Sequence, residues 1–203
     1  MIGTTAPHAT EERSRFRTMN QNDTRHRTGN LTVKRACSDS QIRQIADLAE
    51  IIWNEHFTPI IGKEQVNYMV EKFQSYPALK EQTAKGYEYY QLFDKESFCG
   101  YTGIRPDADG RLFLSKLYIK KEHRGRHLAT QAFDFLKALC RERGYSAIWL
   151  TCNRHNDSSL RVYLHLGFET VDTQQADIGG GFIMDDYIME YTFDEDKLPL
   201  YPR

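Results

Sequence analysis

The chain has 203 residues, with 27 lysines plus arginines, 28 aspartates plus glutamates and a formal net charge of -1 at pH 7. Its hydrophobic fraction of 40% and aromatic fraction of 12% are globular values, which excludes a wholly disordered chain; the length suits one domain with some excess at the ends. A general nucleic-acid-binding protein would carry a strong basic excess, so the near-neutral charge disfavours that class. No apolar run approaches the roughly 18 residues of a membrane-spanning helix. We therefore expect neither a nucleic acid nor a membrane as partner.

The two ends of the chain differ in composition from the rest. Residues 1–30 are polar and nearly free of aliphatic side chains, and the tail 194–203 contains two prolines. We expect a disordered arm over 1–30, one domain over 31–193 and an irregular tail over 194–203. The arm has no apolar signal core and mixes arginines with acidic residues, which argues against a secretory or transit peptide.

The four cysteines, Cys37, Cys99, Cys140 and Cys152, are scattered, and no pair has zinc-knuckle or redox-motif spacing. Three of them lie in apolar stretches, which predicts buried free thiols in a reducing compartment. The sequence thus favours a cytoplasmic protein without a metal site.

Helical periodicity dominates the first third of the domain. Residues 31–36 alternate like a strand, and Ser38 with Gln41 has capping-box spacing, so a helix should begin there. We expect Thr58-Pro59 to break this helix. Two further helices are expected over 63–73 and 77–85.

The middle and end of the domain alternate strands with two more helices. Strands are expected over 87–93, 98–104, 111–120, 147–152, 168–171 and 182–193, and helices over about 125–143 and 156–166. The element order is then β-α-α-β-β-β-α-β-α-β-β, a mixed sheet flanked by helices in the α/β (α+β) class.

Two segments carry residues suited to ligand chemistry. In the first, a strand ending at Ile119 runs into a basic loop with Arg124, Gly125 and Arg126 that opens a helix. Free N–H groups at a helix start, with two arginines, suit a phosphate, although an ordinary solvated basic helix start is an equal alternative.

In the second segment, Asn156 suits a helix N-cap, Gly167 suits the residue after the helix, and Tyr163 shares a face with Asn156 two turns on. Taken alone, this segment fits a capped helix with a core tyrosine better than a site.

The two segments in this order resemble the GCN5-related N-acetyltransferase (GNAT) family. Arg124 to Ala129 is similar to the Arg/Gln-x-x-Gly-x-Gly/Ala acetyl-CoA signature of that family, with His127 at the central glycine. Asn156, Tyr163, Gly167 and Phe168 match its Asn-(x6)-Tyr-(x3)-Gly-Phe segment. The resemblance covers about 31–193 and implies a mostly antiparallel sheet of about seven strands flanked by about four to five helices.

By this resemblance, the protein moves an acetyl group from acetyl-CoA directly to a primary amine of a small molecule or peptide. Strand 117–119 would pair with the pantetheine arm and polarise the thioester carbonyl, and Tyr163 would protonate the departing thiolate. Asn153 would help to separate the strands or would form a turn. The residues implied to bind acetyl-CoA are Leu117, Tyr118, Ile119, Arg124, Gly125, Arg126, His127, Leu128, Ala129, Thr130 and Asn156.

The attacking amine has a pKa of about 10 and must lose a proton first. The strand before the basic loop holds no carboxylate, so the candidate bases are Glu55 and His56 near the end of the first helix and Asp185 and Asp186 on the last strand. For each of them a solvated charge or a cap is the simpler interpretation. Together they suggest an acidic site for a cationic amine.

Two other functions stay open. The same fold could bind CoA as a catalytically weak regulatory protein, which His127 favours and Tyr163 disfavours, and a nucleic-acid module is the rival that the net charge disfavours. The resemblance also implies a homodimer as one candidate assembly. The acceptor amine is not specified by the sequence.

Overall fold

The computed structural model describes residues 25–193, which form an eight-stranded sheet with the order β1-β2-β3-β4-β5-β6-β8-β7. All neighbouring strands are antiparallel except β5 and β6. The strands are β1 (Arg25–Thr28), β2 (Leu31–Arg35), β3 (Glu88–Asp94), β4 (Ser97–Pro106), β5 (Leu112–Ile119), β6 (Ala147–Asn153), β7 (Glu169–Gly179) and β8 (Phe182–Thr192). This confirms the predicted mixed, mostly antiparallel sheet.

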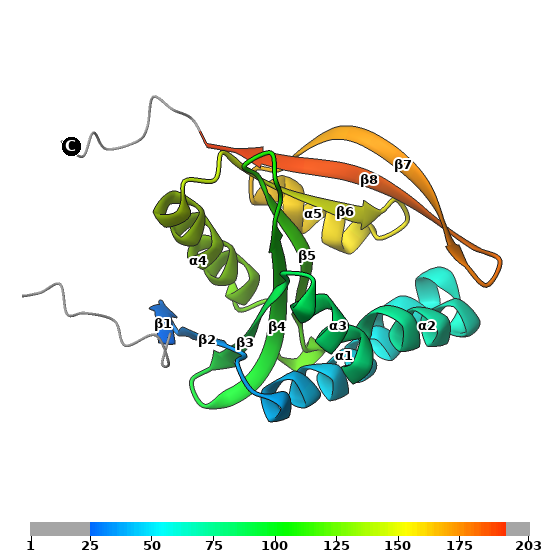
Figure 1. The fold of residues 1–203 in the computed structure, drawn as a ribbon, viewed down its shortest axis with the longest axis horizontal. Coiled ribbons are helices and arrows are strands. Elements are labelled where there is room, and N and C mark those ends of the chain that lie inside the picture. The colour runs from blue at the N-terminus through cyan, green and yellow to red at the C-terminus, as the bar shows by residue number, and fades with distance from the viewer. Residues whose placement is uncertain (1–24, 194–203) are drawn as a thin grey trace, which may run out of the picture.

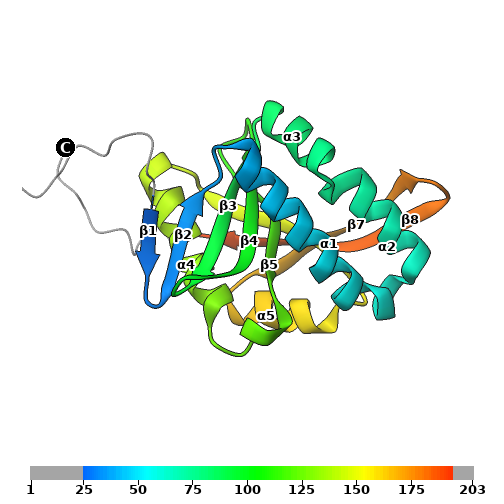
Figure 2. The same cartoon turned by 90° about the horizontal axis from the view of Figure 1, so that it is seen from below.

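Five α-helices are described: α1 (Asp39–Ile61), α2 (Lys63–Met69), α3 (Tyr76–Ala84), α4 (Leu128–Arg143) and α5 (Asp157–His165). A π-helical turn (Val70–Gln74) follows α2, and a 3-10 turn (Lys121–His123) precedes α4. Figure 1 shows α4 on one side of the central strands and α1–α3 on the other. Figure 2 shows β1 to β5 side by side, with α5 below them.

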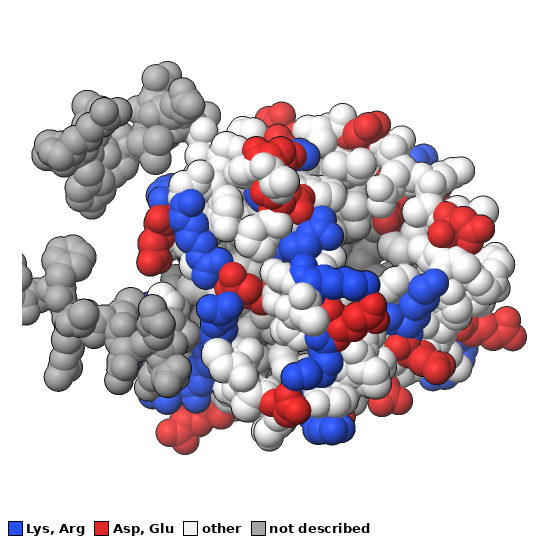
Figure 3. All heavy atoms as spheres, in the orientation of Figure 1, with Lys and Arg blue, Asp and Glu red and all other residues white. Residues whose placement is uncertain are grey.

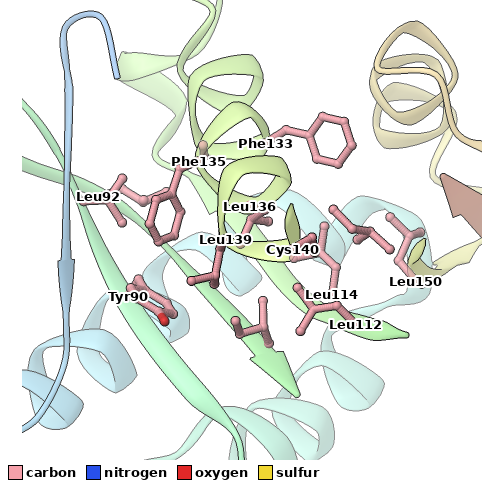
Figure 4. Close-up of a cluster of buried hydrophobic side chains, with 14 of the residues drawn as sticks. Tyr90, Leu92, Leu112, Leu114, Phe133, Phe135, Leu136, Leu139, Cys140 and Leu150 are labelled. Carbon is pink, nitrogen blue, oxygen red and sulfur yellow. The ribbon is translucent and has the colours of Figure 1, made fainter. Parts of the chain in front are cut away.

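Each face of the sheet buries its own apolar cluster. On the α4 face, Phe135, Leu136 and Leu139 pack toward Tyr90 and Leu92 of β3 and toward β5 (Figure 4). On the other face, the apolar stripe of α1 packs over β3 and β4. Through these two clusters, α4 packs on one face of the sheet around β5 and α1 packs on the other.

β5 and β6 are paired only at their start, through Leu112↔Ile148 and Phe113↔Trp149. Beyond this point the strands separate, and the edge of β5 that faces β6 has no strand partner. On its other edge β5 pairs with β4, where Gly103 faces Lys116 and Ile104 faces Leu114. Ser115 is therefore the extra residue of a β-bulge, placed where β5 leaves β6.

The sequence prediction was wrong at several boundaries. Residues 25–28, expected in the disordered arm, form β1, which pairs with β2; the rest of the expected arm, 1–24, and the expected tail, 194–203, lie outside the described residues. Pro59 does not end the first helix but lies inside the last turn of α1. The strand expected over 168–171 continues to Gly179 as β7, and α4 begins at Leu128 rather than at Gly125.

Candidate active site

The gap between β5 and β6 opens on two cavities that meet at one point. Cavity A, of about 540 Å³, lies between the end of β5, residues 123–130 and α5. Cavity B, of about 640 Å³, lies between α1–α3, β5 and β6. Both are lined by Leu117, Tyr118, Ser159 and Tyr163. Two ligands, one in each cavity, would therefore meet beside these four residues.

Cavity A contains the start of α4. His127 precedes the helix in a left-handed conformation (φ 57°, ψ 21°), and no side chain caps the first turn. The first turn also contains no acidic residue, so its free N–H groups and the positive end of the helix dipole suit an anion. Of the predicted loop residues, Arg124, Gly125, His127, Leu128, Ala129 and Thr130 line this cavity.

The unpaired edge of β5 also faces the gap. The N–H of Lys120 donates to the carbonyl of Cys99 on β4 at 2.8 Å. Because backbone groups alternate between the two edges of a strand, the N–H groups of Leu117 and Ile119 point the other way, toward the gap. The carbonyl of Ile119 accepts a hydrogen bond from Arg124 Nε at 2.9 Å. The N–H groups of Leu117 and Ile119 can thus bind an extended ligand as an added strand.

Tyr163 lies on α5 where the two cavities meet. Its ring packs edge-on against Phe168, with 5.6 Å between the ring centroids. Burial raises the pKa of Tyr163 well above 10, so the hydroxyl stays protonated at neutral pH. Because Tyr163 lines both cavities, a ligand in either one can contact this residue.

Asn156 and His56 form one polar contact beside Tyr163. Asn156 is buried, and its Oδ1 caps α5 by accepting from Ser159 N at 3.3 Å. His56 Nε2 lies 3.2 Å from the same oxygen, and its Nδ1 lies 3.4 Å from Arg124 Nη1. Burial and the nearby Arg124 charge lower the pKa of His56. A neutral His56 ring with its proton on Nε2 can donate to Asn156 Oδ1 and accept a hydrogen bond from Arg124 at Nδ1. Asn156 lines cavity B and His56 lines cavity A.

Four of the predicted site residues line neither cavity: Glu55, Arg126, Asp185 and Asp186. Glu55 is exposed, lines neither cavity and lies 3.6 Å from Lys121 Nζ. The guanidinium of Arg126 pairs with the buried Asp94 at 2.5 Å and does not line cavity A. Asp185 pairs with Arg154 at 3.0 Å. Neighbouring helix residues are rotated by about 100°, which separates Glu55 from His56.

Asp186, the other candidate on β8, is fully buried. Neither carboxylate oxygen has a hydrogen-bond partner among the described residues. Burial raises its pKa to about 6, and the nearby charge of Asp185 strengthens this effect. Asp186 pairs across the strands with Asn153, which lines cavity B. It is the carboxylate best suited to take up a proton near neutral pH.

The lining of cavity B is basic, contrary to the expected acidic site. Four cationic side chains line it against one carboxylate, that of Glu81; they are Lys72, Lys85, Arg105 and Lys116. Lys116 is the residue that the sequence prediction missed, since a lysine within a strand normally points to solvent. Asn153 serves the turn after β6, where its Oδ1 accepts from His155 N at 3.0 Å.

Three features bear on other classes of function. Within residues 25–193, no three or more histidine, cysteine, aspartate or glutamate side chains are grouped to hold a metal ion. None of the helices in this range is both long and apolar enough to cross a membrane. On the face drawn in Figure 3, basic and acidic side chains are interspersed.

Comparisons with known proteins agree with this geometry. The model of the acetyltransferase (GNAT) family matches residues 45–168. The uncharacterised N-acetyltransferase YobR of Bacillus subtilis (strain 168) is 23% identical over 120 residues, which are 59% of this chain and 46% of that protein. The chain thus spans about half the length of this curated relative.

Two solved structures share the fold. The PaiA N-acetyltransferase of Thermoplasma acidophilum, in complex with coenzyme A, matches with a TM-score of 0.67 and 18% identity over 80% of this chain and 99% of that chain. The acetyltransferase yncA of Salmonella typhimurium, with its cofactor acetyl-CoA, matches with a TM-score of 0.57 and 15% identity over 84% and 98%. Because the family match covers more than half of the sequence, the chain belongs to the acetyltransferase (GNAT) family of acyltransferases.

Proposed function

We propose that the protein is an N-acetyltransferase that binds acetyl-CoA in cavity A and a primary amine in cavity B. The observation that carries this proposal is the meeting of the two cavities at Tyr163 and at the unpaired edge of β5. An acyl donor and an acceptor need one point of contact, and the rest of each ligand needs its own space. The complexes of the two similar proteins with CoA and acetyl-CoA support the choice of donor.

Cavity A fits the chemistry of acetyl-CoA. The uncapped first turn of α4, with Arg124 beside it, is suited to the pyrophosphate, and residues 124–130 would hold it mainly through backbone N–H groups. The N–H groups of Leu117 and Ile119 would bind the pantetheine arm, with His56 along the same path, while Asn156, which contacts His56, lines cavity B. Arg126 would contribute its backbone alone, because its side chain pairs with Asp94.

When bound, acetyl-CoA supplies an acetyl group activated as a thioester. The N–H groups at the free edge of β5 would stabilise the negative charge that develops on the carbonyl oxygen. Tyr163 would donate a proton to the sulfur as the carbon–sulfur bond breaks and the carbon–nitrogen bond forms. Asp186 lines neither cavity but lies opposite Asn153 of the cavity B lining, and with a pKa of about 6 it would take the proton of the acceptor ammonium through intervening water.

The test combines binding with turnover. CoA and acetyl-CoA should raise the melting temperature, whereas adenosine, which lacks the phosphates, should do much less. Release of free CoA thiol should follow the addition of an amine. Equal protection by adenosine would remove cavity A as the phosphate site.

The variant Tyr163→Phe separates catalysis from packing. The phenyl ring keeps the contact with Phe168, so the melting temperature and the affinity for acetyl-CoA should stay close to the wild type. Turnover should fall roughly 100-fold if the hydroxyl donates the proton. Near-normal turnover would instead assign the donation to water. A protein that binds CoA but acetylates no amine would be the regulatory alternative.

A further inference from the structure

Cavity B contains a buried lysine without an acidic partner. Lys116 is 5% exposed, and it lines the cavity. Its Nζ donates to Gln82 Oε1 at 2.8 Å and to Ser115 Oγ at 3.2 Å. No carboxylate among the described residues forms an ion pair with it. Burial lowers the pKa of Lys116 to about 7. A buried cation held only by neutral acceptors is costly, and an anion in the cavity would offset that cost.

The bulge on β5 places Lys116 in this position. Side chains alternate along a strand, so Leu114 and Lys116 would share a face of a regular β5. Leu114 belongs to the cluster under α4. The extra residue, Ser115, turns Lys116 to the opposite face, where it meets Gln82 of α3 and lies near the rings of Tyr87 and Tyr89.

The other cations of the cavity already have partners or face water. Arg105 pairs with Asp107 at 2.8 Å, and its Nη1 donates to the Tyr87 hydroxyl. Lys85 pairs with Glu81 at 2.6 Å. Lys72 is exposed at the edge of the cavity. Lys116 is thus the buried cation of the lining that an acceptor can neutralise.

We propose that the acceptor is a small amine that also carries a carboxylate, with its carboxylate bound to Lys116 and its amino group directed toward Tyr163. This inference rests on the proposed function and names the substrate class of the same cavity. One buried monocation matches one carboxylate, whereas a phosphate dianion would leave an uncompensated negative charge. A polyamine would add positive charge beside Lys116 and Arg105.

The experiment compares amino acids with their carboxamides, which lack the negative charge; kcat/KM is calculated for the unprotonated amine, because the amide also lowers the pKa of the amino group. In the wild type, kcat/KM of the best amino acid should exceed that of its amide at least tenfold. The variant Lys116→Met should reduce this ratio to about 1, and Lys116→Arg should retain a preference for the acid. The control Lys34→Met removes a lysine of β2 outside both cavities and should leave the ratio unchanged. A ratio near 1 in the wild type, or an unchanged ratio in Lys116→Met, overturns the inference.

The pH dependence supplies a readout that needs no variant. The KM for the amino acid should rise as the pH increases above about 7, because Lys116 then loses its proton, while the KM for the amide should not show this rise. With both KM values calculated for the unprotonated amine, a KM ratio that is independent of pH between 6 and 9 contradicts the pairing.

Binding of products distinguishes failure of this inference from failure of the proposed function. In the presence of CoA, the N-acetylated amino acid should stabilise the protein more than its N-acetylated amide. If no amine is acetylated but this preference holds, the acetyltransferase proposal fails and the carboxylate site stands. If spermidine or the amides are acetylated best, the proposed function stands and the carboxylate site fails.

Discussion

Replacing His127 by glycine should stabilise the protein. His127 adopts φ 57° and ψ 21° directly before α4, a conformation that costs a residue with a Cβ atom about 1–2 kcal/mol. Glycine removes this cost but loses about 0.5–1 kcal/mol through its greater freedom in the unfolded chain. His127 is the N-cap, where glycine is well tolerated, and not an interior helix residue. The net expectation is a gain of about 0.5–1 kcal/mol.

Denaturant unfolding measures this gain, with His127→Ala as the matched control. Both variants remove the imidazole, but alanine keeps the Cβ atom, so the difference between them isolates the backbone strain. Glycine should exceed alanine by about 1 kcal/mol, or roughly 2–4 °C in melting temperature for a protein of this size. Acetyl-CoA affinity should be maintained or increased in the glycine variant. A glycine variant no more stable than the alanine variant would refute the argument, and loss of acetyl-CoA binding would make the imidazole a ligand contact.

Two further predictions concern titrating side chains. The folded-state pKa of Asp186, about 6, is above its ordinary value, so the native state binds the extra proton between about pH 4 and 6 and loses stability as the pH rises through this range. The free energy of unfolding of Asp186→Asn, measured with denaturant and relative to the wild type, should therefore increase by about 3 kcal/mol from pH 4 to pH 7. If this difference between variant and wild type is the same at both pH values, the pKa of Asp186 is not raised. For the thiols, Cys37 is exposed and the other three cysteines are free and buried, so a thiol reagent should modify one cysteine quickly in the native protein and all four after denaturation. Fast reaction of more than one would show that a buried thiol is accessible.

Local chemistry made several elements predictable. The capping box of Ser38 and Gln41 forms as expected, Gly144 ends α4 in a left-handed conformation and Asn156 caps α5. In each case the signal and its hydrogen-bond partner lie within one helical turn. For the same reason, the boundaries that depended on such residues were close to those of the structure.

The errors arose where distant contacts decided the structure. β1 is polar and has no hydrophobic alternation, and the two-residue turn Gly29-Asn30, with Gly29 at φ 58°, was the one available signal for it. The β7 sequence is largely exposed, so its pairing with β8 leaves no apolar pattern. Near Pro59, Phe57 is buried, and Gly62 N donates to the carbonyl of Thr58. These contacts retain the last turn of α1 despite the missing N–H.

The same difference between local signals and distant contacts applies to the candidate site. The turn before α4 and the Asn156 cap of α5 were predictable, because turns and caps have local signatures. The basic lining of cavity B was not, because the position of Lys116 depends on the bulge at Ser115. A bulge cannot be located from one strand alone, since it is a mismatch in length between two paired strands.

That single extra residue has two linked effects. It lies where β5 departs from β6, so it contributes to the gap that exposes the N–H groups of Leu117 and Ile119. It also reverses the face on which Lys116 lies, and so brings a buried cation into cavity B. Straightening β5 would therefore be expected to alter donor binding and acceptor charge together. The strand that would position the thioester is in this way the strand that sets the charge of the acceptor site.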